Sequence, residues 1–205
     1  MKNRIGIFGG LFDPVHIGHL SMARCAVDGG EVNEVIFVPN GQPPHKDGFC
    51  ASGEHRFNML KIATGKYDEF SVSDFELDTS CFHYTVDTMR HFRNMYPDSE
   101  VVFILGADSL NYVDKWMDAQ NLILENTFLV INRHFDKEYN ISDNVNRIKS
   151  LGGHVERVDM PFVDISSTQI REAILSGKAA ESFVPDGVWE YIKDNKLYIG
   201  ENHDY

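Results

Sequence analysis

Long apolar runs are absent from this sequence of 205 residues. None approaches the roughly 18 consecutive apolar residues of a membrane-spanning helix, so we expect no membrane-embedded segment. The first residues, Met1–Arg4, lack the order of charged, apolar and small residues that marks a secretory signal. These absences favour a cytoplasmic protein that folds as a single domain over residues 1–205.

Cysteine is also scarce, and its positions form no pattern. Cys25, Cys50 and Cys81 lie far apart and include no CxxC pair. An odd number of widely spaced cysteines is typical of reduced thiols in the cytosol. The sequence therefore predicts neither a disulfide framework nor a cysteine-rich zinc site.

Basic residues are few: 19 Lys and Arg stand against 31 Asp and Glu, which gives a net charge of −12. Such a surface repels polyanions, so we expect no nucleic-acid partner. A phosphate-bearing ligand is compatible with this charge only if a few cations gather in one cleft and Mg²⁺ neutralises part of the ligand's charge. The composition is equally compatible with a monomer and with a homo-oligomer.

The most informative segment that is present is Ile5–Leu20, which reads IGIFGGLFDPVHIGHL. An apolar strand ends at Gly9 and Gly10, a turn follows, and His16 and His19 open a helix. In this order of strand, glycine turn and helix, backbone N–H groups and a helix N-terminus face an anion. Two imidazoles three residues apart lie on one helix face and can donate hydrogen bonds to phosphate oxygens.

A zinc site is the competing interpretation of these two histidines. The zinc-binding helix of metalloproteases has its histidines four residues apart, with a glutamate between them. Here the spacing is three, Gly18 lies in the gap, and no neighbouring Cys or Glu completes a ligand set. The spacing therefore favours phosphate binding, and we expect no metal held by protein ligands.

Apolar strands and helices alternate along the chain. We expect strands over residues 5–8, 34–39, 70–72, 100–105, 128–131 and 155–158, and helices over 20–27, 54–63, 84–95 and 167–176. Continuously apolar strands indicate a parallel sheet that is covered on both faces. The predicted fold is α/β, a Rossmann-like doubly wound parallel sheet with helices on both faces. Ligands of such folds bind beyond the carboxyl ends of the strands, where the motifs of this chain fall.

Residues 43–46, of sequence PPHK, follow the second predicted strand. A Pro-Pro pair stiffens the backbone and would hold Lys46 over a phosphate. A lysine is a compact point charge suited to a phosphoryl group that gains negative charge during transfer. We therefore expect Lys46 to contribute to a phosphate site.

A second cationic segment, Ile165–Arg171, reads ISSTQIR. Ser166 or Ser167 is expected to cap a helix, and Arg171 lies one turn into that helix, on the face of Ser167. Hydroxyls, a helix N-terminus and a guanidinium together suit phosphate groups. An ordinary capped helix with a surface arginine explains the same residues equally well.

The predicted strand over residues 100–105 leads into GADSL. Asp108 in this segment can accept hydrogen bonds from ribose hydroxyls or cap the next helix, and the sequence does not separate these roles. Trp116 is one of two tryptophans in the chain. Most tryptophans pack in cores, but one near a strand end can stack on an aromatic ligand.

Taken in chain order, GGLFDPVHIGH, PPHK, HYTVDT, GADSL with its following Trp, and ISSTQIR span residues 9–171. Together they resemble the bacterial nicotinate-nucleotide adenylyltransferases of the nucleotidylyltransferase superfamily. The resemblance implies a transferase of NAD biosynthesis that joins nicotinate mononucleotide to the AMP part of ATP, giving deamido-NAD and pyrophosphate. It also implies that Mg²⁺ is bound with ATP.

The same resemblance assigns the residues that act on the triphosphate. His16 and His19 contact it, with His19 nearest the reacting α-phosphorus. Lys46 and Arg171 neutralise phosphate charge, and Ser167 helps to hold the departing pyrophosphate. No protein nucleophile or general base is needed, because the phosphate of the mononucleotide is already an anion.

Further residues are assigned to the nucleoside parts of the substrates. Gly9 and Gly10 let the substrates approach the backbone. Asp108 takes the ATP ribose, and Arg133 lies near the nucleotide.

The nicotinate ring is assigned a pocket of its own. Tyr84 and Thr85 present backbone groups to the carboxylate of the ring, and Trp116 stacks on the ring. The family has a serine before the Tyr-Thr pair, whereas this chain has His83. Because histidine is larger than serine, we expect it to change the shape of the pocket and to affect the preference for the acid over the amide.

Three alternatives share parts of these patterns. Pantetheine-phosphate adenylyltransferases have the HxGH element, but their chains are shorter and lack the GADSL segment with its following Trp. A cytidylyltransferase fits less well, because Asp164 and Ile165 precede the serines in place of an Arg-Thr-Glu-Gly lead-in. A non-catalytic nucleotide-binding sensor with the same fold is the alternative of another class, and the intact histidines and cations argue against it.

Overall fold

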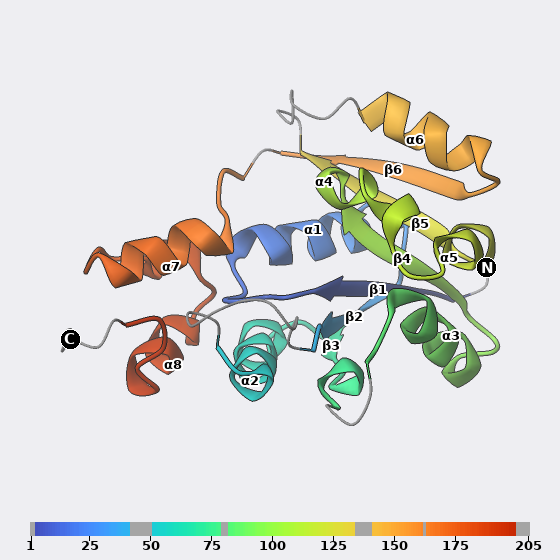
Figure 1. Cartoon of the computed structure of the whole chain (residues 1–205). Helices are drawn as coiled ribbons and strands as arrows, with labels where there is room; N and C mark the ends of the chain where they lie inside the picture. The colour runs from blue at the N-terminus through green and yellow to red at the C-terminus, as the bar shows by residue number, and fades with distance from the viewer. Residues whose placement is uncertain (1–2, 42–50, 79–81, 134–140, 162, 200–205) are drawn as a thin grey trace.

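The structure of the chain, a computed structural model, describes residues 3–41, 51–78, 82–133, 141–161 and 163–199. Within these ranges six strands form one sheet in the order β3-β2-β1-β4-β5-β6, and every neighbouring pair is parallel (Figure 1). The strands are β1 (Arg4–Gly10), β2 (Glu34–Pro39), β3 (Phe70–Val72), β4 (Glu100–Gly106), β5 (Thr127–Arg133) and β6 (His154–Met160). The predicted parallel α/β sheet is confirmed.

Helices cover both faces of the sheet, as expected for a doubly wound fold. One buried apolar cluster joins the sheet to α1 (Ile17–Asp28), α2 (Gly53–Thr64), α7 (Ser167–Leu175) and α8 (Val188–Asp194). A second cluster joins the opposite face to α3 (Thr85–Met95), α4 (Ala107–Leu110), α5 (Ala119–Glu125) and α6 (Ile141–Ser150). Short 3₁₀ helices are η1 (Phe75–Leu77), η2 (Val113–Lys115) and η3 (Glu181–Phe183).

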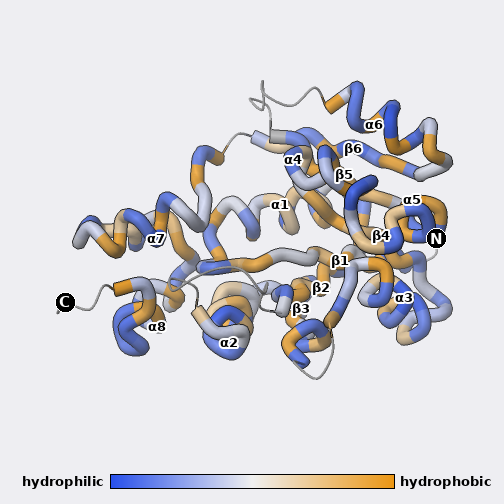
Figure 2. Tube along the Cα trace, in the orientation of Figure 1, coloured by the Kyte–Doolittle hydropathy of each residue, from blue (hydrophilic) through white to orange (hydrophobic). Residues whose placement is uncertain are grey.

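Strand β4 shows why the strands are continuously apolar. Its residues Val101–Gly106 are all buried. Val102 and Ile104 belong to the first cluster, whereas Phe103 and Leu105 belong to the second. Successive side chains enter opposite cores, so neither face of the strand can be polar. In Figure 2 the central strands are largely in hydrophobic colour, whereas the outer helices alternate between hydrophilic and hydrophobic colour.

The strand order places a ligand crevice between β1 and β4. The chain moves outward from β1 through β2 and β3, then returns to build β4, β5 and β6 on the other side of β1. At this reversal the connections of β1 and β4 leave in opposite directions, which opens a crevice beyond their carboxyl ends. In Figure 1, α7 and α8 lie beyond the carboxyl end of β1.

The sequence patterns missed four helices and misplaced the start of another. α4, α5 and α8 have seven residues or fewer, too short for a helical period to emerge. α6 buries one residue, Ile148, among its polar neighbours. α1 begins at Ile17 rather than at Leu20, so both motif histidines belong to its first turn. No helix in the described ranges is long and apolar enough to cross a membrane.

Candidate active site

The turn after β1 is built around a buried phenylalanine. Phe12 has a φ of 50°, in the left-handed region that non-glycine residues rarely adopt, and only 2 % of its surface is exposed. A Cβ on Gly10 would lie 2.9 Å from this ring, so only glycine leaves room for it. Backbone strain of this kind gathers at functional sites. Phe12 is part of the sequence motif, but no role was predicted for it.

The two motif histidines form the first turn of α1. His16 is the N-cap, and its backbone N–H donates to Nδ1 of His19 at 3.2 Å. Because Nδ1 accepts this bond, the neutral ring of His19 carries its proton on Nε2. The rings stack with centroids 3.7 Å apart, and a Cβ on Gly18 would lie 3.0 Å from the ring of His16. The predicted placement of both imidazoles on one face is confirmed.

Aromatic packing holds His19 in place. Its ring lies edge-on to Phe12 at a centroid distance of 4.9 Å and to Phe8 at 6.2 Å. These contacts, with the bond to Nδ1, fix the orientation of the ring.

A cavity of about 160 Å³ lies at the carboxyl ends of β1 and β4. Its lining joins residues from β1, α1, β4, α4 and the end of η2, namely Phe8, Gly9, Gly10, Phe12, His19, Met22, Phe103, Leu105, Gly106, Asp108, Ser109 and Trp116. Five predicted site residues from distant parts of the chain therefore meet at the crevice that the strand order creates. A larger cleft of about 930 Å³ lies along α1 and η3, and no predicted site residue lines it.

Asp108 and Trp116 line this cavity together with His19. The N-cap of α4 is Gly106, and Asp108 stands inside the helix as an exposed residue, so the capping alternative is wrong. A Cβ on Gly106 would lie 2.5 Å from Oδ1 of Asp108, so the Asp108 side chain would have to move to admit one. Trp116 is half-buried and packs edge-on against Phe103 at 6.1 Å. The indole therefore packs against Phe103 and also lines the cavity.

α7 is tied directly to the turn after β1. Ser166 is its N-cap, in a reciprocal pair with Gln169. The hydroxyl of Ser167 donates to the Pro14 carbonyl at 2.9 Å, and Nη1 of Arg171 donates to the Asp13 carbonyl at 2.6 Å. Arg171 therefore lies beside the histidine turn and is not an ordinary surface arginine.

Two buried ionisable side chains support this turn and were missed by the sequence patterns. The carboxylate of Asp13 is fully buried and accepts hydrogen bonds from the Ala51 N–H at 3.0 Å and the Tyr198 hydroxyl at 2.6 Å. Arg56 is also fully buried and donates to the carbonyls of Leu11 at 2.9 Å and Ala51 at 3.2 Å. The sequence gives no local signal for either role, because Asp13 bonds with Ala51 and Tyr198, and Arg56 with Leu11, across at least 38 residues.

The predicted nicotinate segment starts α3, with Tyr84 as its N-cap and Thr85 as its first residue. Neither residue lines the cavity of about 160 Å³. The ring of His83 packs against Phe75 at 4.9 Å, and its Nε2 lies 3.1 Å from the Asp78 carbonyl oxygen. His83, which stands where the family has serine, therefore packs against η1.

A buried carboxylate connects this segment to the ends of β1 and β2. Glu76 accepts hydrogen bonds from Thr88 in α3 at 2.5 Å and from the Asn40 side chain at 2.6 Å. The backbone N–H of Asn40 donates in turn to the Gly10 carbonyl at 2.8 Å. Burial raises the pKa of Glu76, while the two donors oppose that shift. Hydrogen bonds therefore run from the glycine turn to α3.

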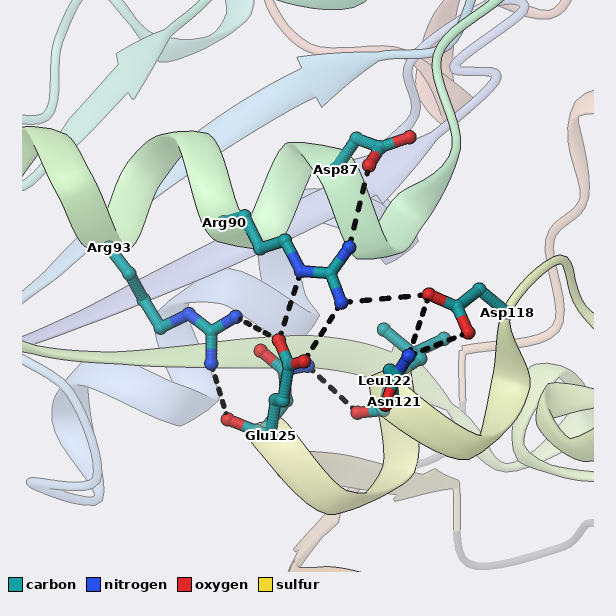
Figure 3. A network of polar contacts seen from close by, with 8 residues as sticks. Asp87, Arg90, Arg93, Asp118, Asn121, Leu122 and Glu125 are labelled. Carbon is teal, nitrogen blue, oxygen red and sulfur yellow. Dashed lines mark hydrogen bonds and ion pairs between the residues drawn. The ribbon is translucent and has the colours of Figure 1, made fainter.

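An ion-pair network joins α3 to α5 and to Asp118, two residues after Trp116 in the sequence (Figure 3). Arg90 binds both carboxylate oxygens of Glu125, at 2.8 and 3.1 Å, and lies 3.5 Å from Asp118. Arg93 donates to the carboxylate of Glu125 at 2.7 Å and to its backbone carbonyl at 2.6 Å. Hydrogen bonds from Arg90 first, and then from Arg93, lower the pKa of Glu125 to about 2.

We expect Glu125→Gln to remove stability that depends on pH. A folded-state pKa below the ordinary 4.5 means that ionised Glu125 stabilises the fold above about pH 4.5, and that this stability is lost as the pH falls towards 2. Because the side chain is 32 % exposed, we expect only about 1 kcal/mol at neutral pH. Urea unfolding of wild type and variant at about pH 7, 4 and 3 measures the difference.

The matched control is Asp186→Asn, which breaks an ion pair whose carboxylate is 96 % exposed. It should leave the free energy of unfolding nearly unchanged at every pH. A difference between wild type and Glu125→Gln that stays constant from neutral to acid pH would contradict the assignment.

Two predicted site residues lie wholly or partly outside the described residues. Lys46 lies outside the described residues. Arg133 ends β5 at the same carboxyl edge, and its side chain lies outside the described part. Their predicted roles remain predictions.

Comparisons with known proteins identify similar chains. A family model for cytidylyltransferase-like proteins matches residues 7–173. A relative from Caldicellulosiruptor saccharolyticus, named "probable nicotinate-nucleotide adenylyltransferase", is 39% identical over 199 residues, covering 95% of this chain and 98% of the relative. A relative from Listeria welshimeri with the same name is 38% identical over 200 residues, covering 97% and 98%.

Among solved structures, the chain resembles Plasmodium falciparum nicotinic acid mononucleotide adenylyltransferase in its complex with NaAD. The TM-score is 0.79 at 22% identity, over 96% of this chain and 97% of that one. At this identity the likeness establishes the fold.

Proposed function

The chain belongs to the cytidylyltransferase-like family and, within it, to the nicotinate-nucleotide adenylyltransferases, and on this premise we propose how its residues perform that reaction. The enzyme transfers the adenylyl group of ATP to nicotinate mononucleotide and releases deamido-NAD and pyrophosphate in NAD biosynthesis. The observation that carries the proposal is the position of His19. Its ring is fixed by backbone and aromatic contacts and lines the cavity between β1 and β4.

In the proposed reaction a phosphate oxygen of nicotinate mononucleotide attacks the α-phosphorus of ATP. A new P–O bond forms as the bond to the bridging oxygen of pyrophosphate breaks, and pyrophosphate leaves with the electron pair. The nucleophile is already an anion, so the protein has no proton to remove. Catalysis then rests on positioning and on stabilising the negative charge of the transition state.

We assign the phosphate groups of ATP to residues of the site from their positions. His19 donates to the α-phosphate, and His16 fixes its tautomer through the backbone N–H. Arg171 and Ser167, beside the Asp13–Pro14 turn, receive the β- and γ-phosphates. Lys46 supplies a further positive charge. Each contact grows stronger as charge moves onto the departing pyrophosphate.

Mg²⁺ enters this proposal as the partner of ATP. Among the described residues, no group of three or more His, Cys, Asp or Glu side chains is arranged to hold a metal ion, and one carboxylate, Asp108, lines the cavity. This donor set suits an ion held chiefly by phosphate oxygens and water. The ion would neutralise triphosphate charge, which the acidic chain needs.

We assign the nucleoside parts of the substrates to the cavity residues contributed by α4 and the end of η2. Asp108 accepts hydrogen bonds from the ATP ribose, and Trp116 stacks on the pyridine ring. Gly9 and Gly10 let both substrates approach the backbone, while Arg133 lies near the nucleotide. Tyr84 and Thr85, at the start of α3, offer backbone N–H groups to the nicotinate carboxylate.

We expect the enzyme to prefer nicotinate mononucleotide over its amide by about tenfold to a hundredfold in kcat/KM. Backbone donors arranged for a carboxylate meet the amide NH₂, which offers no acceptor, and an unpaired buried donor costs about 1–3 kcal/mol. Because His83 packs against Phe75, His83→Ser should change this ratio by no more than about twofold. A ratio near one in the wild type would reject the carboxylate site.

Pyrophosphate release from MgATP with a panel of acceptors tests the function as a whole. Nicotinate mononucleotide should give the highest kcat/KM, and phosphopantetheine should give none above background. Turnover with phosphopantetheine alone would favour a pantetheine-phosphate adenylyltransferase. ATP binding without turnover of any acceptor would favour a non-catalytic nucleotide-binding sensor with the same fold.

A further inference from the structure

The chain after α8 turns back into the core at a strained point. Leu197 and Tyr198 are both buried, and they pack in the same apolar cluster as Phe12. Lys196 and Tyr198 have φ values of 51° and 64°, in the left-handed region that disfavours residues other than glycine. A conformation of this kind persists only where the surrounding contacts enforce it.

The contact that the strained segment makes is a short hydrogen bond. The Tyr198 hydroxyl donates to Oδ1 of Asp13 at 2.6 Å, within the range of charge-assisted O–H···O⁻ bonds. Burial first, and then the Asp13 carboxylate, raise the pKa of Tyr198, so the hydroxyl stays protonated and remains a donor. The bond joins two residues 185 positions apart in the chain.

Asp13 is the junction at which the phosphate-binding segments meet. Besides Tyr198, its carboxylate accepts the N–H of Ala51, which precedes α2. Nη1 of Arg171 lies 4.0 Å from its other oxygen, Oδ2, and donates to its backbone carbonyl. A displacement of the Asp13 side chain would therefore act on the arginine that faces the triphosphate.

Resting on the proposed function, we propose that Tyr198 is a positioning residue of the ATP site. Its hydroxyl holds the buried carboxylate of Asp13, and Asp13 in turn holds Arg171 where the β- and γ-phosphates are bound. The C-terminal segment thereby takes part in ATP binding without touching the substrate. No role was predicted for it from the motifs, which end at Arg171.

Without the hydroxyl, Oδ1 of Asp13 would lack one of its two donors in a fully buried environment. The carboxylate would then turn towards Arg171 and draw the guanidinium away from the phosphates. We expect Tyr198→Phe to raise the KM for ATP by about 5- to 50-fold. The KM for nicotinate mononucleotide should change by less than about twofold, because that substrate makes no contact with Arg171.

Tyr191→Phe is the matched control. Tyr191 lies in α8, and its hydroxyl bonds with Nδ1 of His55 at 3.0 Å and the Asn58 amide at 3.2 Å. Its loss removes tertiary hydrogen bonds of the same C-terminal region without reaching Asp13. Both KM values, kcat and the melting temperature are measured for each variant, well below its unfolding temperature. Equal changes in the two KM values, or equal behaviour of the two variants, would overturn the proposal.

A double-mutant cycle separates positioning from general stability. If Tyr198 acts through Arg171, adding Tyr198→Phe to Arg171→Ala should raise the KM for ATP by less than a further twofold or so. Fully multiplicative effects would overturn this route. Should Tyr198→Phe fail to fold, Asp13→Asn takes its place. We expect this variant to raise the KM for ATP more than the KM for nicotinate mononucleotide, and an equal rise in both would count against the proposal.

Calorimetric titration with MgATP distinguishes this proposal from the proposed function. A wild-type protein that binds MgATP but gives no pyrophosphate with any acceptor would refute the reaction and still allow the Kd values of the variants to be compared. Weaker MgATP binding by Tyr198→Phe than by Tyr191→Phe supports the positioning role, and equal binding refutes it.

Discussion

His19→Ala should lower kcat by at least about 100-fold while leaving the melting temperature close to that of the wild type. The ring supplies one preorganised donor to the α-phosphate, and loss of such a donor costs about 2.7–4 kcal/mol of transition-state stabilisation. The fold should tolerate the change because α1 keeps its buried residues, such as Leu20 and Ala23. Steady-state pyrophosphate release and thermal unfolding measure the two effects.

His154→Ala is the control for this variant. His154 lies at the amino end of β6, whereas the cavity lies at the carboxyl ends of β1 and β4. Its side chain is 68 % exposed. Its replacement should leave kcat unchanged. Wild-type turnover by His19→Ala would show that His19 is not the phosphate donor.

Arg171→Ala should have the second largest effect, a rise in the KM for ATP of about 10- to 150-fold. The estimate follows from the 1.5–3 kcal/mol or so that hydrogen bonds to charged groups contribute. The KM for nicotinate mononucleotide should rise far less, because Arg171 lies one helical turn from Ser167, on the pyrophosphate side of the site. Initial rates with each substrate varied in turn measure both constants.

Arg157→Ala controls for the loss of positive charge. Arg157 lies on β6, pairs with Asp159 and is 42 % exposed. It should leave both KM values within about twofold of the wild type. If Arg171→Ala raised the KM values for the two substrates equally, the assignment of Arg171 to the ATP site would be wrong.

The sheet could be predicted from the sequence because burial on both faces leaves a direct signal. Strands such as β4 and β5 contain uninterrupted apolar runs, and the longer helices α1, α2, α3 and α7 were also predicted. α4, α5 and α8 were missed because each has seven residues or fewer, and such helices depend on tertiary packing. The start of α1 was missed because histidine is not among the residues that commonly cap helices.

The candidate site was predictable where chemistry is local in the sequence. The glycine pair, the histidine pair and the serines before Arg171 are contiguous motifs, and the cavity and the turn after β1 bring them to one edge. The support around them was not predictable in this way. Asp13 meets Tyr198 across 185 residues, and no spacing rule connects a turn near one end of the chain to a tyrosine near the other.

The central claim is direct transfer of the adenylyl group from ATP to nicotinate mononucleotide in this site. It is tested most directly with ATP that carries radioactive phosphorus at the α-position, followed by an acid quench and separation of protein from nucleotides. The account predicts that all transferred label appears in deamido-NAD, in an amount equal to the pyrophosphate released, and that none is bound to the protein. Label retained covalently by the protein, or absent from deamido-NAD while pyrophosphate accumulates, would contradict it.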